Sequence, residues 1–288
     1  MRWTRLSHVP HSGLISWIHT IWRKAKRKIR YLVKRELGRW RAQLLGTNLS
    51  NADFLQALDS RNLTIQEIQN HLSIRNAPHF FLDPGCRKEN VDNILRCCPE
   101  SKGRIIAAAD QVCDHVFDLL GSGSIDLGEQ INWHLDFKTG YRFEPDKYYA
   151  DVRPAPYPGG YDIKVPWELS RCQHFVWLGQ AYWFTNDEKY AQEFVNQVLD
   201  WIEHNTPQFG VNWTCTMDVA IRAVNWLWGY HFFKDSSSLD DDFLMAFFKS
   251  LLIHGRHIWR NLENQGDFTG NHYLSNLVGL IYLSILCP

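Results

Sequence analysis

Residues 215–233 read CTMDVAIRAVNWLWGYHFF, and this stretch decides the fold class. Apolar side chains surround the helix that it predicts, whereas Asp218, Arg222 and Asn225 follow one another at spacings of four and three residues. Residues at such spacings lie on one face of a helix. The pattern therefore predicts a buried helix with one polar stripe, which suits an inner helix whose stripe faces a wet cleft. A buried Asp–Arg pair that only fixes the packing stays open as the alternative.

Further long helices are predicted on both sides of this stretch. Their apolar periodicity and short connections contain no strand pattern, which predicts an all-α fold of antiparallel helical hairpins. The segment 77–98, which contains Pro78, Pro84 and Gly85, is expected to be a loop. The segment 125–165 is irregular and rich in aromatic residues, and long loops in compact domains are usually functional. The other helices are expected at residues 51–59, 64–75, 103–120, 166–184, 187–204 and 239–262, and from 271 onward.

The chain has a strongly basic beginning and a mildly acidic remainder. Residues 1–45 hold 12 Lys and Arg residues and a single acid, Glu36, whereas the rest holds 19 basic and 30 acidic residues. Because 14–45 also predicts one long amphipathic helix, we expect residues 1–50 to form a basic helical arm and residues 51–288 to form the body. Such an arm suits contact with a membrane surface, a nucleic acid or an anionic glycan, or it packs one apolar face on the body.

Cysteine usage and hydropathy exclude several classes of protein. The seven cysteines are an odd number with no C-x-x-C spacing, so the sequence predicts no metal site, no redox motif and no cofactor. No run of 18 or more apolar residues exists, so no transmembrane segment is expected, and no signal peptide is evident. The body carries no nucleic-acid-binding motif, so nucleic acid is not an expected partner.

Three motifs follow one another in the body. They are DIKVPWELSR at residues 162–171, GVNWTCTMDVAIRAVNW at residues 210–226, and the pair Asn271–His272 at the start of a predicted helix. In order and spacing they resemble the heparinase II/III family of bacterial polysaccharide lyases, and the similarity covers roughly residues 100–288. The resemblance implies an incomplete (α/α) toroid that carries the substrate cleft. In the family an antiparallel β-sandwich follows this toroid, so the body is expected to be incomplete at its C-terminal end.

The resemblance also implies a reaction, the β-elimination of uronic-acid polysaccharides such as glycosaminoglycans. The proton next to the uronate carboxylate is removed, so hydrogen bonds must first neutralise that carboxylate, and a base and an acid then move protons. In the family an Asn neutralises the carboxylate, and a Tyr and a His transfer the protons. Asn271 matches the family's Asn, and we expect its neighbour His272 to help orient the carboxylate. The family's Tyr and its further His would lie beyond the end of this chain, and Tyr273 is not that tyrosine.

Several other residues are expected to bind the substrate. Arg171 and Arg222 suit a uronate carboxylate or a sulfate, because a guanidinium group binds such anions bidentately. Trp213 is either a platform for a sugar ring or a core residue. Asp218 is expected to orient the cleft rather than to do chemistry. The predicted substrate-binding set is Glu168, Arg171, Asn212, Trp213, Asp218, Arg222 and Tyr273.

Two other functions remain open. The first is a non-catalytic glycan-binding domain, because the apolar helix from residue 277 to 286 needs further helices to cover it. The second is a glycoside hydrolase on a similar toroid, with Glu168 and Asp218 as its two carboxylates. Each of them has an Arg three or four residues away, which favours the ionised form and suits an orienting role better than a general acid. The resemblance suggests the periplasm or the cell surface as the compartment.

Overall fold

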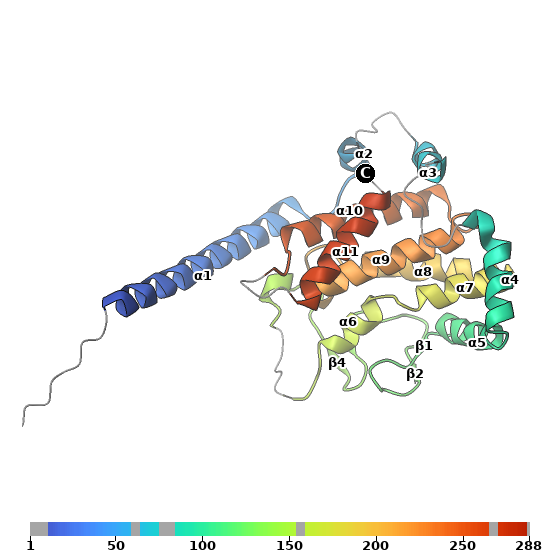
Figure 1. Ribbon diagram of the computed structural model, residues 1–288, viewed down its shortest axis with the longest axis horizontal. Helices are drawn as coiled ribbons and strands as arrows, with labels where there is room; N and C mark the ends of the chain where they lie inside the picture. The colour runs from blue at the N-terminus through green and yellow to red at the C-terminus, as the bar shows by residue number, and fades with distance from the viewer. Residues whose placement is uncertain (1–10, 59–63, 75–83, 154–158, 265–269, 287–288) are drawn as a thin grey trace, which may run out of the picture. The chain divides into compact units, whose positions relative to one another are not determined.

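The computed structural model divides the chain into two compact units, Met1–Thr47 and Asn48–Pro288 (Figure 1). The first unit contains α1 (His11–Leu45), the long basic helix that the sequence predicts. Within α1, the side chain of Arg39 donates a hydrogen bond to Glu36, one turn earlier. The structure describes residues 11–58, 64–74, 84–153, 159–264 and 270–286.

The second unit is mainly helical, as predicted. Its short strands form two antiparallel pairs between residues 116 and 142, where the sequence showed no strand pattern. These are β1 (Val116–Phe117) with β2 (Ile125–Asp126), and β3 (Leu135–Asp136) with β4 (Tyr141–Arg142). The helices are α2 (Asn51–Ala57), α3 (Ile65–Ile74), α4 (Arg87–Cys97), α5 (Ser101–Cys113), α6 (Lys164–Ser170), α7 (Phe175–Thr185), α8 (Lys189–His204), α9 (Thr216–Phe233), α10 (Asp241–Arg260) and α11 (Asn271–Leu286), with 3-10 turns η1 (Pro84–Cys86), η2 (Tyr149–Asp151) and η3 (Val211–Trp213).

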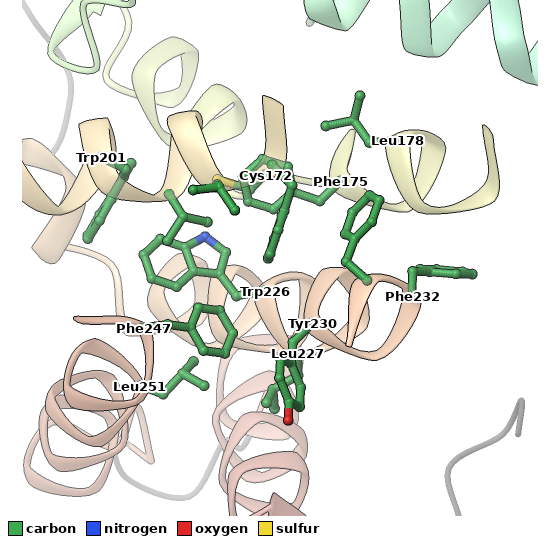
Figure 2. Packing of buried hydrophobic residues seen from close by; sticks show 14 of the residues in the cluster. Cys172, Phe175, Leu178, Trp201, Trp226, Leu227, Tyr230, Phe232, Phe247 and Leu251 are labelled. Carbon is green, nitrogen blue, oxygen red and sulfur yellow. The ribbon is translucent and has the colours of Figure 1, made fainter. Parts of the chain in front are cut away.

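The helix α9 lies in the middle of the helical body, packed against α7, α10 and α11 (Figure 1). Figure 2 shows Trp226 of α9 among the buried side chains of its neighbours. The ring of Trp226 meets Trp201 of α8 edge to face at 5.4 Å and stacks on Phe247 of α10 at 5.9 Å. On α11, a Cβ at Gly279 would lie 2.8 Å from the Cβ of Ala220, so these two helices approach closely. The apolar side chains that surround the helix predicted at residues 215–233 therefore form the packing surface of a central helix.

The single helix predicted at residues 166–184 is wrong, because the chain forms α6 and α7 with a break between them. Cys172 has a φ of 54°, in the left-handed region that a continuing helix cannot use. The break leaves carbonyl groups at the end of α6 without partners within the helix. Side chains of α9 bind them: Asn225 donates from Nδ2 to the carbonyl of Arg171 at 2.9 Å, and Arg222 donates from Nη1 to that of Ser170 at 3.4 Å. The polar stripe of α9 thus stabilises the break.

Two other predicted boundaries are also wrong. The loop expected at residues 77–98 contains α4, although residues 77–83 lie outside the described residues. Arg87 fixes the start of α4 by donating from Nη2 to the carbonyl of Tyr182, at the C-terminal end of α7, at 2.6 Å. The helix expected at 103–120 ends at Cys113, because His115 adopts a φ of 52° and the chain turns into β1. Both differences depend on contacts or backbone angles that sequence periodicity does not encode.

Helix α3 begins with the capping box that the spacing of Thr64 and Glu67 predicts. The amide of Glu67 donates to Oγ1 of Thr64 at 3.2 Å, and the amide of Thr64 donates to Oε2 of Glu67 at 2.7 Å. The same spacing at Thr185 and Glu188 predicts a second box, which does not form. The hydroxyl of Thr185 instead donates to the carbonyl of Ala181 at 2.8 Å, because Thr185 still belongs to the last turn of α7.

One face of α11 presents apolar side chains at the surface of the described chain. Within the described ranges, no helix combines the length and the apolar character needed to cross a membrane. The exposed apolar residues of α11 are Leu274, Leu277, Val278 and Ile281.

Candidate functional site

Arg171, in the break after α6, joins two of the carboxylates predicted to bind substrate. Its Nε donates to Oδ1 of Asp218 at 2.5 Å, and its Nη1 donates to Oε2 of Glu168. Asp218 is buried, whereas a fifth of the Arg171 side chain is exposed. Burial acts against the charge of Arg171, but the two carboxylates outweigh it and raise its pKa. Helical spacing suggested that Asp218 pairs with Arg222, but in the structure Asp218 forms its ion pair with Arg171.

Arg222 lies wholly inside the protein, and other groups of the protein surround its guanidinium. Nε donates to Nε2 of His254 at 2.9 Å and Nη2 donates to the carbonyl of Asn212 at 3.1 Å. Its carbon centre lies 4.1 Å from the ring centroid of Trp201 and 5.5 Å from that of Trp213. Burial lowers the pKa of Arg222 to about 10. Arg222, predicted to bind substrate, thus has no exposed surface in this structure, and protein groups engage its guanidinium.

Asn212 and Trp213, in η3, are also buried. Nδ2 of Asn212 donates to the carbonyl of Trp133 and to Oδ1 of Asn205, both at 2.8 Å. The indole Nε1 of Trp213 donates to the carbonyl of Asn205 at 3.3 Å. Of the two roles left open for Trp213, the structure therefore shows the core residue and not an exposed platform for a sugar ring. These contacts fix the segment that leads into α9.

Asn271 and His272 form the first turn of α11, at the surface. The amide of Asn271 is exposed, and its Nδ2 lies 3.9 Å from Sδ of Met217 near the start of α9. The side chain of His272 is 44% exposed, which leaves part of the ring accessible to a ligand. Tyr273, the next residue, is half-buried. The predicted catalytic pair thus lies beside the N-terminus of the central helix.

Glu263, which the sequence did not single out, holds His272 in place. Oε1 of Glu263 lies 2.9 Å from Nδ1 of His272. Its other oxygen, Oε2, accepts hydrogen bonds from the amide of Met217 at 2.8 Å and from Nδ2 of Asn276 at 3.1 Å. The amide of Glu263 in turn donates to Oδ1 of the buried Asn276 at 2.8 Å. Because an ionised carboxylate only accepts, a proton lies on Nδ1 of His272 in this contact.

Sequence reasoning missed Glu263 for a definite reason. His272 and Asn276 are four residues apart, so helical spacing alone places them on one face of α11. Glu263 follows α10 outside any helix, and nothing in its neighbourhood resembles a site motif. Only the folded chain brings it to the start of α9.

Cys215 lies between two groups of polar residues, Glu168–Arg171–Asp218 and Glu263–His272. It occupies the N-cap position of α9, and its Sγ lies 3.9 Å from Nδ1 of His272 and 4.0 Å from Oε1 of Glu263. Burial, together with the negative charges of Asp218 and Glu263, raises the pKa of its thiol. A row of polar side chains therefore runs from Arg171 to the first turn of α11. The row offers an exposed amide, a partly exposed imidazole and a partly exposed guanidinium, which are groups that hydrogen-bond to anionic oxygens.

Residues 52–288 match the family described as Heparinase II/III N-terminus. This chain belongs to the heparinase II/III N-terminus family. The heparin-sulfate lyase of Bacteroides stercoris is 26% identical over 204 residues, which is 62% of this chain and 26% of that protein. The heparin-sulfate lyase of Pedobacter heparinus is 26% identical over 171 residues, or 57% of this chain and 21% of that protein.

Two solved structures share the fold of this heparinase II/III family chain. A heparinase III structure with methylated lysines has a TM-score of 0.54 at 23% identity, and the alignment covers 81% of this chain and 34% of that one. A mutant heparan sulfate lyase from Pedobacter heparinus has a TM-score of 0.52 at 20% identity, with 81% and 32% covered. The helical body therefore has the incomplete (α/α) toroid fold that the sequence predicts. The chain spans between about a fifth and a third of the length of these relatives.

Proposed function

We propose that this chain is the toroid part of a polysaccharide lyase that cleaves a uronate-containing glycosaminoglycan by β-elimination. Membership of the heparinase II/III family supports this class of reaction, and the similar proteins named heparin-sulfate lyase support a glycosaminoglycan substrate. The observation that carries the proposal is the position of Asn271 and His272. They are exposed together at the N-terminus of a 16-residue helix, within reach of a ligand from solvent.

In this proposal Asn271 neutralises the uronate carboxylate. Its amide Nδ2 donates a hydrogen bond to a carboxylate oxygen, and the positive end of the α11 dipole favours an anion at the same place. The second negative charge that develops when the neighbouring C5 proton leaves is thereby stabilised. His272, held through Nδ1 by Glu263, is the neighbour of Asn271 in the first turn of α11 and helps to position the carboxylate.

Arg171 and Glu168 are proposed to border the substrate. A partly exposed guanidinium that already binds two carboxylates has donors left for an anionic sugar. Asp218, held by Arg171, sets the direction of that guanidinium, and Tyr273 lines the cleft beside Asn271. The acid and base that move the protons are proposed to come from sequence outside this chain, in the region where the relatives extend beyond it.

The test measures the unsaturated uronate that only elimination produces, by its ultraviolet absorbance. This chain, and the chain together with any sequence that follows Pro288 in the same reading frame, are incubated with heparan sulfate and with alginate. We expect absorbance from the longer form on heparan sulfate, reduced by about 10²- to 10³-fold in kcat/KM by Asn271→Ala. Asn196→Ala is the matched control, because Asn196 is exposed on α8, outside the proposed site.

The outcomes separate the alternatives. New reducing ends without absorbance would indicate a hydrolase and contradict elimination. Retained binding of heparan sulfate without any product from either form would indicate a non-catalytic glycan-binding domain. Equal activity of Asn271→Ala and Asn196→Ala would remove Asn271 from the reaction.

A further inference from the structure

Three potential metal ligands from different parts of the chain meet at the start of α9. Cys215 precedes α9, Glu263 follows α10, and His272 lies in the first turn of α11. Their ligand atoms, Sγ, a carboxylate oxygen and a ring nitrogen, all lie within 4.8 Å of one another. In sequence they are separated by 48 and 9 residues, so no ligand motif could show them.

We propose that Cys215, Glu263 and His272 form a binding site for a divalent transition metal, with Zn²⁺ as the best match. Thiolate, imidazole and carboxylate are the ligands that Zn²⁺ uses in proteins, and three of them with a fourth position open to solvent is the arrangement of a reactive site. The hard ions Mg²⁺ and Ca²⁺ prefer oxygen ligands only and are disfavoured by the sulfur.

The distances suit a tetrahedral ion after small movements. Zn–S bonds of about 2.3 Å and Zn–N and Zn–O bonds of about 2.0–2.2 Å place tetrahedral ligand atoms roughly 3.3–3.6 Å apart. The observed separations are 3.9 Å from Sγ to Nδ1, 4.0 Å from Sγ to Oε1, and 2.9 Å from Nδ1 to Oε1. Each atom would have to move by about half an ångström, which is a side-chain adjustment. His272 is 44% exposed and has room to turn.

The surroundings already orient the carboxylate. Oε2 of Glu263 is engaged by the amide of Met217 and by Nδ2 of Asn276, so Oε1 faces Cys215 and His272. Such outer hydrogen bonds hold metal ligands in position and raise their affinity. Asn276 is fully buried, and its amide contacts both the backbone and the side chain of Glu263. The buried Asn276 therefore fixes Glu263, the carboxylate ligand of the site, from the side away from solvent.

The local charge favours a dication. Glu168, Asp218 and Glu263 bring three carboxylates to this region, and Arg171 offsets one of them. Oδ2 of the buried Asp218 has no hydrogen-bond partner among the described residues. When the ion binds, the proton on Nδ1 of His272 is given up and Nε2 carries the ring proton instead, by exchange with solvent. The thiol proton of Cys215 passes to solvent, and the new Zn–S bond uses the electron pair of the thiolate. Burial and the neighbouring carboxylates destabilise the thiolate, and the positive charge of the bound ion offsets this effect.

The test uses Co²⁺ as a spectroscopic probe and Zn²⁺ as its competitor. Bonding of Co²⁺ to a thiolate gives a near-ultraviolet charge-transfer absorption, and tetrahedral geometry gives intense visible bands. We expect both in the reduced full chain, saturating at one ion per chain and removed by Zn²⁺. Cys215→Ser should abolish the charge-transfer absorption, whereas Cys97→Ser/Cys98→Ser should retain it, since those thiols are exposed elsewhere.

A second variant keeps the result decisive if Cys215→Ser fails to fold. His272→Ala removes a half-exposed side chain, and it should weaken Zn²⁺ binding by at least about tenfold, measured by competition with a chromophoric chelator. Absence of the charge-transfer absorption in the unaltered chain would overturn the proposal. So would its persistence in Cys215→Ser, or unchanged Zn²⁺ affinity in His272→Ala. No glycan is needed, so the result does not depend on the proposed lyase activity.

Discussion

Glu263 caps the N-terminus of α9 through the backbone amide of Met217, across 46 residues of sequence. The usual local cap is missing, because the side chain of Cys215 at the N-cap position makes no capping hydrogen bond. A carboxylate at this place binds an amide that has no partner within the helix and meets the positive end of the helix dipole. The same carboxylate holds His272. The start of the central helix and the position of the imidazole are therefore coupled through one side chain.

We predict that Glu263→Gln lowers the free energy of unfolding by about 1–2 kcal/mol. The amide keeps the shape, but it loses the charge at the helix end and cannot accept from Met217, Asn276 and His272 at once. Urea unfolding followed by circular dichroism measures the change. Glu129→Gln, at an exposed loop position, is the control and should change stability by less than about 0.5 kcal/mol. Equal losses in the two variants would contradict the capping role.

The sequence predicted the helices whose stability comes from periodic apolar burial. The expected boundaries at 187–204, 215–233 and 239–262 agree with α8, α9 and α10 to within two residues. It did not predict the break after α6, because that break is stabilised by Arg222 and Asn225, which lie some 50 residues further along the chain. Local patterns report which side chains are apolar, and they do not report which distant donor binds a freed carbonyl.

The candidate site was also predictable from the sequence only in part. Family resemblance pointed to Asn271 and His272, and the structure places both at the surface beside α9. The charges on the stripe of α9 were visible in the sequence, but their partners were not. Asp218 binds Arg171, and Arg222 turns inward to His254. Spacing along a helix predicts a shared face, but the neighbouring helices determine which charges meet.

We predict that Arg222→Lys lowers the free energy of unfolding by about 2–4 kcal/mol. A single ammonium group cannot replace the planar fork that binds His254, Asn212 and Ser170, and buried acceptors left without donors cost about 1–3 kcal/mol each. Chemical denaturation measures the loss. Arg142→Lys, at an exposed position, is the control. Unchanged stability with weaker glycan binding would instead mean that Arg222 reaches the substrate.

Two helical glycines are predicted to respond in opposite ways to the same substitution. Gly279→Ala places a methyl group 2.8 Å from the Cβ of Ala220 and 3.1 Å from its Cα, so α11 must move from α9 at a cost of about 1–3 kcal/mol. Gly103→Ala on α5 has nothing within 4 Å of the new Cβ, and it should stabilise by up to about 1 kcal/mol through helix propensity. Thermal unfolding of both variants provides the comparison. Destabilisation by Gly103→Ala, or none by Gly279→Ala, would contradict the packing described for α9 and α11.

Acid should destabilise the protein partly through His174. This ring is buried between Phe117 and Phe175, and Nε2 lies 2.8 Å from Oε1 of Gln197. Burial lowers its pKa to about 4, whereas the unfolded chain keeps a value near 6.5. As pH falls below about 6.5, the unfolded state takes up the proton first. The stability from the neutral ring is therefore complete above pH 6.5 and is lost between about pH 6.5 and 4.

The size of this effect follows from the difference between the two pKa values, and amounts to about 3 kcal/mol at the acid end. Between pH 6.5 and 4 the free energy of unfolding of His174→Gln should fall by about 3 kcal/mol less than that of the unaltered protein. Urea unfolding of both proteins at a series of pH values measures this difference. At pH 7.5 the ring is neutral in both states, so the difference measured there reports packing alone and serves as the baseline. Identical slopes for the two proteins would mean that His174 is protonated in the folded state without disturbing the core, and the buried neutral ring would then be the wrong description.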